Sequence, residues 1–163
     1  MISANLIINK GKYDNDDAIF KTINYISRLD NENIFYYGIW PPTKENSITL
    51  FEELRCRFPE NTCPQKVQHF WITYKSLKDT VFINTFADRI AFFFAPVYPI
   101  CFSTHNDKKH WHSHFVVSTT SYFPDQPPLI GATWRSYLNM VENFSLSNGI
   151  LLKEMYKIPN GIW

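Results

Sequence analysis

Four of the five histidines of this chain lie in the ten residues from His105 to His114, and three of them are separated by single residues. Successive side chains of a β-strand point to opposite faces, so His110, His112 and His114 would share one face, about 6 to 7 Å apart from one to the next. We therefore expect a strand from Trp111 to Thr119 in which neighbouring imidazoles can share one metal ion.

A second strand is predicted just before this one, from Tyr98 to Thr104, and a polar turn at Asn106 to Lys109 makes the pair a hairpin. His105, at the end of the first strand, can reach across to complete a three-nitrogen site with open coordination positions, as a catalytic metal needs. A structural zinc site is usually closed by a fourth ligand such as cysteine, and this segment has none. Asp107 is suited either to orienting His105 or His110 or to forming the turn.

The other segments alternate between helix and strand character. Helices are predicted from Ala18 to Leu29, Ser47 to Phe58, Thr80 to Ala95 and Trp134 to Leu146, and strands at Asn5 to Asn9, Ile34 to Trp40, Val67 to Tyr74 and Ile150 to Tyr156. This order indicates an α+β sandwich in which helices pack on one mostly antiparallel sheet. A chain of 163 residues suits a single domain, residues 1–163.

Charge and cysteine content narrow the class of protein. The chain has 16 basic and 15 acidic residues, so a nucleic-acid partner would be held by a local patch and not by a bulk field. Its three cysteines form no C-x-x-C pair, which argues against a disulfide framework. Because no apolar stretch approaches the roughly 20 residues that cross a bilayer, and because no secretory signal is evident, we expect a soluble cytoplasmic protein.

The segment from Thr104 to Ser118 resembles the metal motif of plasmid mobilisation relaxases, which belong to the HUH endonucleases. Members often read threonine-histidine-x-aspartate, then two residues, then histidine-x-histidine-asparagine-histidine and a β-branched run. By this match the metal ligands are His105, His112 and His114. The resemblance also implies the fold of MobA-type relaxase domains, a ferredoxin-like or Rep-like sandwich with a mostly antiparallel five-stranded sheet and packed helices.

Other site residues follow from the same resemblance. Ile23-Asn24-Tyr25-Ile26 resembles the N-terminal tyrosine motif of relaxases, which makes Tyr25 the nucleophile. His110 and Asp107 would be auxiliary residues of the metal site. The chain departs from the family pattern at Ser113 and Ser118, where asparagines are usual, and after the tyrosine motif, where Leu29-Asp30-Asn31-Glu32 stands in place of lysine-threonine.

The resemblance implies a DNA strand transferase, an endonuclease that nicks one strand at an origin of transfer through a covalent 5′-phosphotyrosine. The cofactor would be a divalent cation, Mn²⁺ or Mg²⁺, and three imidazoles also suit Zn²⁺, Ni²⁺ or Co²⁺. The partner would be single-stranded DNA at an origin of transfer or replication, with accessory mobilisation proteins as further candidates. Lys108 and Lys109 flank the site and either contact the DNA backbone or form a solvated turn.

Two alternatives remain open. Within the same chemistry, the chain would be a rolling-circle replication initiator or a single-tyrosine transposase. In a transposase the nucleophile would sit on the helix after the histidine motif, where Tyr137 is the candidate. From a different class, the chain would be a non-catalytic DNA-binding relative that keeps the fold and the metal but has lost cleavage.

Overall fold

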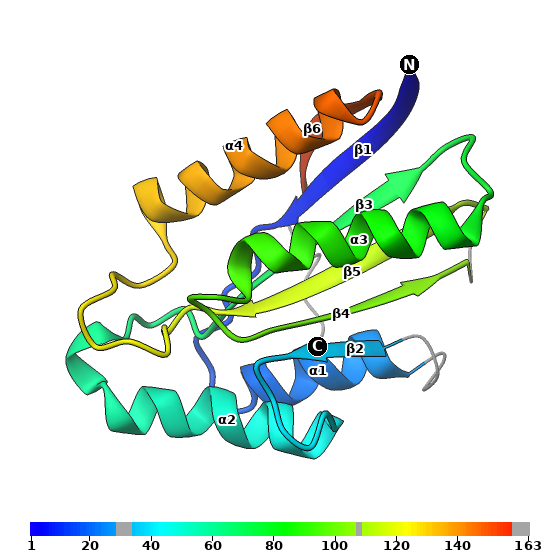
Figure 1. Cartoon of the computed structure of the whole chain (residues 1–163). Helices are drawn as coiled ribbons and strands as arrows, with labels where there is room; N and C mark the ends of the chain where they lie inside the picture. Colours follow the sequence, from blue (N-terminus) through cyan, green and yellow to red (C-terminus); the bar gives the residue numbers. More distant parts are fainter. Residues whose placement is uncertain (29–33, 107–108, 158–163) are drawn as a thin grey trace.

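The computed structural model describes residues 1–28, 34–106 and 109–157, and Figure 1 shows a central sheet with helices on both sides. The elements follow one another as β1 (Ile2–Asn9), α1 (Ala18–Ser27), β2 (Ile34–Tyr37), α2 (Lys44–Arg57), the short 3-10 helix η2 (Pro59–Asn61), β3 (Val67–Tyr74), α3 (Thr80–Phe94), β4 (Ile100–His105), β5 (Trp111–Ser118), α4 (Gly131–Ser147) and β6 (Ile150–Lys157). The α+β class is confirmed.

The sheet differs from the one that the resemblance implies in its strand number and in one pairing. Among the described residues it has six strands in the order β2-β4-β5-β3-β1-β6, so the five strands implied by the resemblance are wrong, while the six strands predicted from the sequence pattern are present. Four pairings are antiparallel, but β1 and β6 run parallel. Since β5 and β6 point the same way, the chain between them must cross back over the sheet, and α4 is that crossover. The sheet is therefore mixed.

The helices divide between the two faces of the sheet (Figure 1). α3 and α4 cover one face, where Phe70, Phe102 and Phe115 from the central strands are fully buried. α1 and α2 cover part of the other face, with Val67, Cys101 and Val116 packed beneath them, as well as Ile19, Ile23 and Phe51 of the helices themselves. Because side chains alternate along each strand, every second residue of β3, β4 and β5 faces α1.

Local signals explain several boundaries. The side chain of Thr43 caps α2 by accepting a hydrogen bond from the Asn46 amide, and Asp79 caps α3 through the Phe82 amide. β2 ends at Tyr37, earlier than predicted, because Gly38 takes a left-handed φ of 75° and turns the chain away. Among the described residues, no helix is both long and apolar enough to cross a bilayer.

The predicted hairpin is confirmed as β4 and β5. Its register pairs His105 with His112 and Ser103 with His114, and on its other side β5 pairs His114 with Trp71 of β3. His105 of β4 therefore lies beside His112 and His114 of β5, and all three are on the face that α1 covers.

Candidate metal centre

Three histidines converge on one face of the β4–β5 hairpin. His105, His112 and His114 each offer a ligand atom, and these atoms all lie within 4.8 Å of one another. The three side chains are buried, with at most 8% of their surface exposed. Their ring centroids are 4.3 to 5.1 Å apart. Buried imidazole nitrogens this close form a donor set that suits a transition-metal cation with coordination positions left for other ligands.

A backbone hydrogen bond orients His112. Its Nδ1 lies 2.9 Å from the carbonyl oxygen of His110. A carbonyl only accepts, so Nδ1 carries the proton and donates it, which leaves Nε2 of His112 with its lone pair available for a cation. Donation of the second ring nitrogen to a backbone carbonyl is the usual way in which a metal-binding histidine is held in one tautomer.

His114 is oriented from the opposite side by a buried chain of hydrogen bonds. Nδ1 of His114 lies 3.1 Å from Nε2 of His69, and Nδ1 of His69 lies 3.0 Å from the hydroxyl of Tyr13. Burial, with a smaller contribution from the charge of Lys157, lowers the pKa of His69 to about 3, and burial raises the pKa of Tyr13. Both groups are therefore neutral at pH 7, and neutral His69 can accept from His114 and donate to Tyr13.

Tyr25 lies beside the histidines. It projects from α1, whose buried residues Ile19, Ile23 and Ile26 fix the helix on the sheet. The Tyr25 ring meets His114 edge to face at 5.7 Å and His69 at 5.9 Å between centroids. The guanidinium of Arg28, one turn along the chain, lies 3.9 Å from the centre of the Tyr25 ring.

A cavity of about 170 Å³ is lined by the tyrosine and by two of the three histidines. Its walls include Tyr25, both strand β5 ligands His112 and His114, and the cations Lys109 and Lys157. His110 also lines it, although β5 begins one residue later and the His110 ring is not part of the triad. The predicted residues Asp107 and Lys108 lie outside the described residues.

Tyr137 is placed elsewhere. It lies on α4, on the face of the sheet opposite the histidines, with its ring stacked on Phe94 at 4.9 Å and edge-on to Tyr98 at 5.7 Å. The structure therefore brings Tyr25, and not Tyr137, to the histidine cluster.

Comparison of the chain with family models, characterised proteins and solved structures finds no match. The geometry of the site therefore carries the functional argument.

Sequence reasoning missed two residues of the site. His69 is not among the site residues that the sequence predicts, and its bond to His114 appears only once β3 is paired with β5. Lys157 belongs to β6, and its ammonium lies 5.6 Å from the centre of the Trp71 ring of β3. Because β6 and β3 are far apart in the sequence, this contact could not be predicted. The alternation of Val67, His69, Trp71 and Thr73 on one face of β3 was the available signal for His69.

Proposed function

We propose that this chain is a cytoplasmic, metal-dependent DNA relaxase. It nicks one strand of DNA at a specific site, an origin of transfer, through a covalent bond between Tyr25 and the 5′ phosphate. One observation carries the proposal: a tyrosine ring lies 5.7 Å from one member of a buried set of three histidines, and the tyrosine lines one cavity together with two of them. A set of cation-binding histidines, two of which line one cavity with a nucleophile, is an arrangement that suits phosphodiester transfer.

The reaction at Tyr25 replaces a phosphodiester bond of the DNA with a phosphodiester bond to the tyrosine. The phenol oxygen attacks phosphorus, the bond from phosphorus to the 3′ oxygen breaks, and the leaving oxygen takes up one proton for the one that the phenol loses. The products are a phosphotyrosine ester and a 3′ hydroxyl. Because one diester replaces another, the reverse attack by a 3′ hydroxyl reseals the strand without an external energy source.

His105, His112 and His114 would hold the cation, Mn²⁺ or Mg²⁺ in the cell, through their unprotonated ring nitrogens. When bound, such a cation polarises the phosphoryl group and stabilises the charge that develops on its oxygens. The chain's own contribution is to fix the donor atoms in advance: the carbonyl of His110 sets the tautomer of His112, and His69 sets that of His114.

Cationic side chains around the cavity fit a phosphodiester substrate. Lys109 and Lys157 line it, and Arg28 lies over the tyrosine ring. The net charge of the chain is only +1, so this local concentration is where a DNA backbone would be attracted. Trp71, which stacks on His114 at 5.3 Å and is partly exposed, offers a flat surface to an unpaired base beside the cavity.

Rolling-circle initiation uses the same chemistry at an origin of replication, and the same site would serve it. A transposase using Tyr137 is less favoured because the sheet separates that side chain from the histidines.

The deciding experiment is incubation of the full chain with labelled single-stranded oligonucleotides and Mn²⁺ or Mg²⁺, followed by denaturing electrophoresis. We expect a shifted covalent band that disappears with a chelator and in Tyr25→Phe, while Tyr137→Phe retains it. A band that persists in Tyr25→Phe would reject the assigned nucleophile. Absence of a band with the origin sequence present, in a protein that still binds DNA and metal, would indicate the non-catalytic relative.

A further inference from the structure

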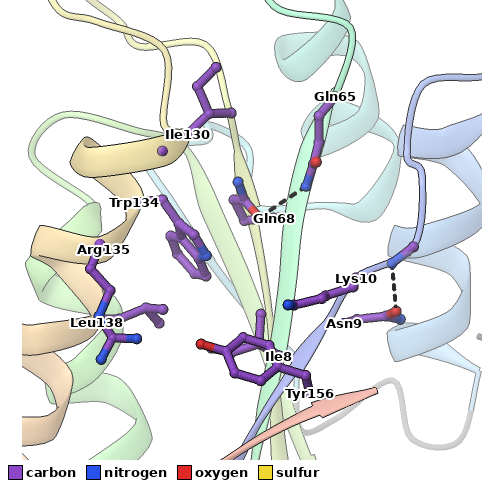
Figure 2. A pocket seen from close by; sticks show the side chains of 12 residues that line it. Ile8, Asn9, Lys10, Gln65, Gln68, Ile130, Trp134, Arg135, Leu138 and Tyr156 are labelled. Carbon is purple, nitrogen blue, oxygen red and sulfur yellow. Dashed lines mark hydrogen bonds between the residues drawn. The ribbon is translucent and has the colours of Figure 1, made fainter. Parts of the chain in front are cut away.

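A second cavity, of about 350 Å³, opens on the face of the sheet opposite the histidines. Figure 2 shows its walls: Trp134, Arg135 and Leu138 come from the start of α4, and facing them are side chains from the ends of β1 and β6 and the beginning of β3. None of these residues takes part in the metal centre. The cavity is large enough for one heterocyclic ring with its sugar.

The lining of this cavity combines a flat aromatic surface with directional polar groups. The indole of Trp134 is partly exposed, while its inner side packs against Phe70 at 5.6 Å. Across from it lie the side-chain amides of Gln65 and Gln68, which are tied to each other at 3.0 Å (Figure 2). Gln68 is also fixed by donating to the carbonyl of Leu129. Aromatic stacking with fixed amides is the chemistry that holds an unpaired nucleobase.

Positive charge at the opening of the second cavity suits the phosphate of a bound nucleotide. Arg135 is compensated by Glu154, 2.7 Å away. The ammonium of Lys10 instead lies 3.9 Å from the centre of the exposed Tyr156 ring, and no carboxylate of the described residues forms an ion pair with it. Lys10 thus presents a positive charge at the rim beside an aromatic ring.

The two cavities lie on either side of the same end of β6. Tyr156 lines the second cavity and the next residue, Lys157, lines the cavity between Tyr25 and the histidines. Consecutive residues of a strand point to opposite faces and are about 3.3 Å apart along it. Since β6 is the last strand of the sheet, no strand in the described part of the chain blocks a path around this edge.

We propose that the second cavity binds one unpaired nucleotide of the same DNA strand whose phosphate is held at the metal centre. The strand leaves the histidine face along Lys157, passes around the edge at β6 and places a base against Trp134 and the glutamine amides, with its phosphate near Lys10. This inference rests on the proposed function for the identity of the strand, but it concerns binding and not cleavage.

The test uses binding and cross-linking with Mn²⁺ present, in a Tyr25→Phe background, so that the phosphate can be held at the metal centre but the strand is not cleaved. A 20-nucleotide oligothymidine containing 5-iododeoxyuridine is irradiated with the protein, and the cross-linked peptides are mapped by mass spectrometry. We expect cross-links to peptides containing Trp134 or Tyr156, and dissociation constants about tenfold higher for Trp134→Leu than for the parent protein.

Three further variants guard against a folding artefact, because Trp134 also packs in the core. Lys10 is on the surface, and Lys10→Gln should raise the dissociation constant for DNA and reduce the slope of its dependence on salt concentration by about one. Lys12 does not line the cavity, so Lys12→Gln should change neither quantity. Trp40→Leu, an exposed tryptophan in another part of the chain, should bind DNA like the parent.

The outcomes separate the two proposals. Cross-links at Trp134 or Tyr156 in the Tyr25→Phe protein, together with no nicking of origin DNA by the protein that keeps Tyr25, would support the nucleotide cavity and reject the catalytic proposal. Nicking without these cross-links, and with unchanged binding in Trp134→Leu and Lys10→Gln, would reject the cavity alone. Saturable binding of free thymidine monophosphate at Trp134, with no cross-link to the oligonucleotide, would also reject it, since the ligand would then be a mononucleotide and not the strand.

Discussion

Nε2 of His69 lies 3.1 Å from Nδ1 of His114, so a histidine that does not line the cavity contacts one of the three rings of the candidate metal site. When His69 accepts in this bond, Nδ1 of His114 carries the proton and the lone pair of His114 is on Nε2. The group that accepts a hydrogen bond from a metal-binding histidine is often a carboxylate. His69 differs from a carboxylate because it brings no negative charge into this buried part of the protein. Its neutral state is maintained by burial, which lowers the pKa of His69 to about 3.

Replacing His69 should weaken metal binding although His69 is not one of the three candidate metal ligands. We expect His69→Ala to lower the affinity for Mn²⁺ or Co²⁺ about 10- to 100-fold, because His114 loses the partner that orients it. His69→Gln, which can still accept from Nδ1 of His114, should retain most of the affinity. Isothermal titration calorimetry measures the affinity, and the visible spectrum of bound Co²⁺ reports the geometry. Equal affinities for wild type and a folded His69→Ala would refute the orienting role.

Binding of a cation should stabilise the fold, since the triad is assembled only in the native chain. At a metal concentration 100 times the dissociation constant the gain is about 2.7 kcal/mol, visible as a rise in Tm by calorimetry. His112→Ala should abolish the rise.

His110→Ala is the matched control, because it removes a neighbouring imidazole but keeps the carbonyl that accepts from His112. The same metal-dependent rise in all three proteins would show that the ion binds elsewhere.

The metal-free protein should lose stability on acidification through His69. In the unfolded chain this histidine takes up a proton near its ordinary pKa of 6.5, whereas in the folded chain it does so only near 3. Between these values the unfolded state binds more protons, so stability falls as the pH drops. From pH 7 to pH 5 the contribution of His69 is about 2 kcal/mol.

Urea unfolding of the metal-free wild type and His69→Gln at both pH values measures this difference. The wild type should lose about 2 kcal/mol more than the variant, because the other titrating groups are common to both. Parallel losses would mean that His69 is protonated in the folded protein at pH 5.

Lys157 should contribute to DNA affinity as a phosphate contact. Lys157→Gln is expected to raise the dissociation constant for single-stranded DNA and to reduce the dependence on salt by about one ion, in fluorescence anisotropy titrations. Lys153→Gln is the control, because Lys153 lies four residues earlier on the same exposed side of β6 but does not line the cavity. Identical salt slopes for the two variants would remove Lys157 from the DNA path.

Periodicity and turn chemistry predicted the local structure well. The bounds of β3 match the expectation, and the hairpin that carries the triad was predicted from two apolar runs and a polar turn. The convergence of His105, His112 and His114 followed because all three lie in one hairpin, where register is a local property.

The sequence alone did not predict which strands pair when they are far apart in the chain. Nothing in the residues of β6 indicates that it runs parallel to β1, since that depends on the crossover of α4. The same reason hid His69 and Lys157, whose neighbours belong to strands far away in the chain. The position of Tyr137 behind the sheet likewise depends on which face α4 covers, and a single amphipathic helix does not specify that.

The placement of all three imidazoles within ten residues has a consequence for how the chain folds. A hairpin closes on itself rapidly and needs no distant partner, whereas docking of α1 requires the central strands to be in place. Cation capture and delivery of the phenol are thus separate events in the folding order. A chain whose first helix fails to dock would still carry the three histidines on one hairpin but would lack the phenol beside them.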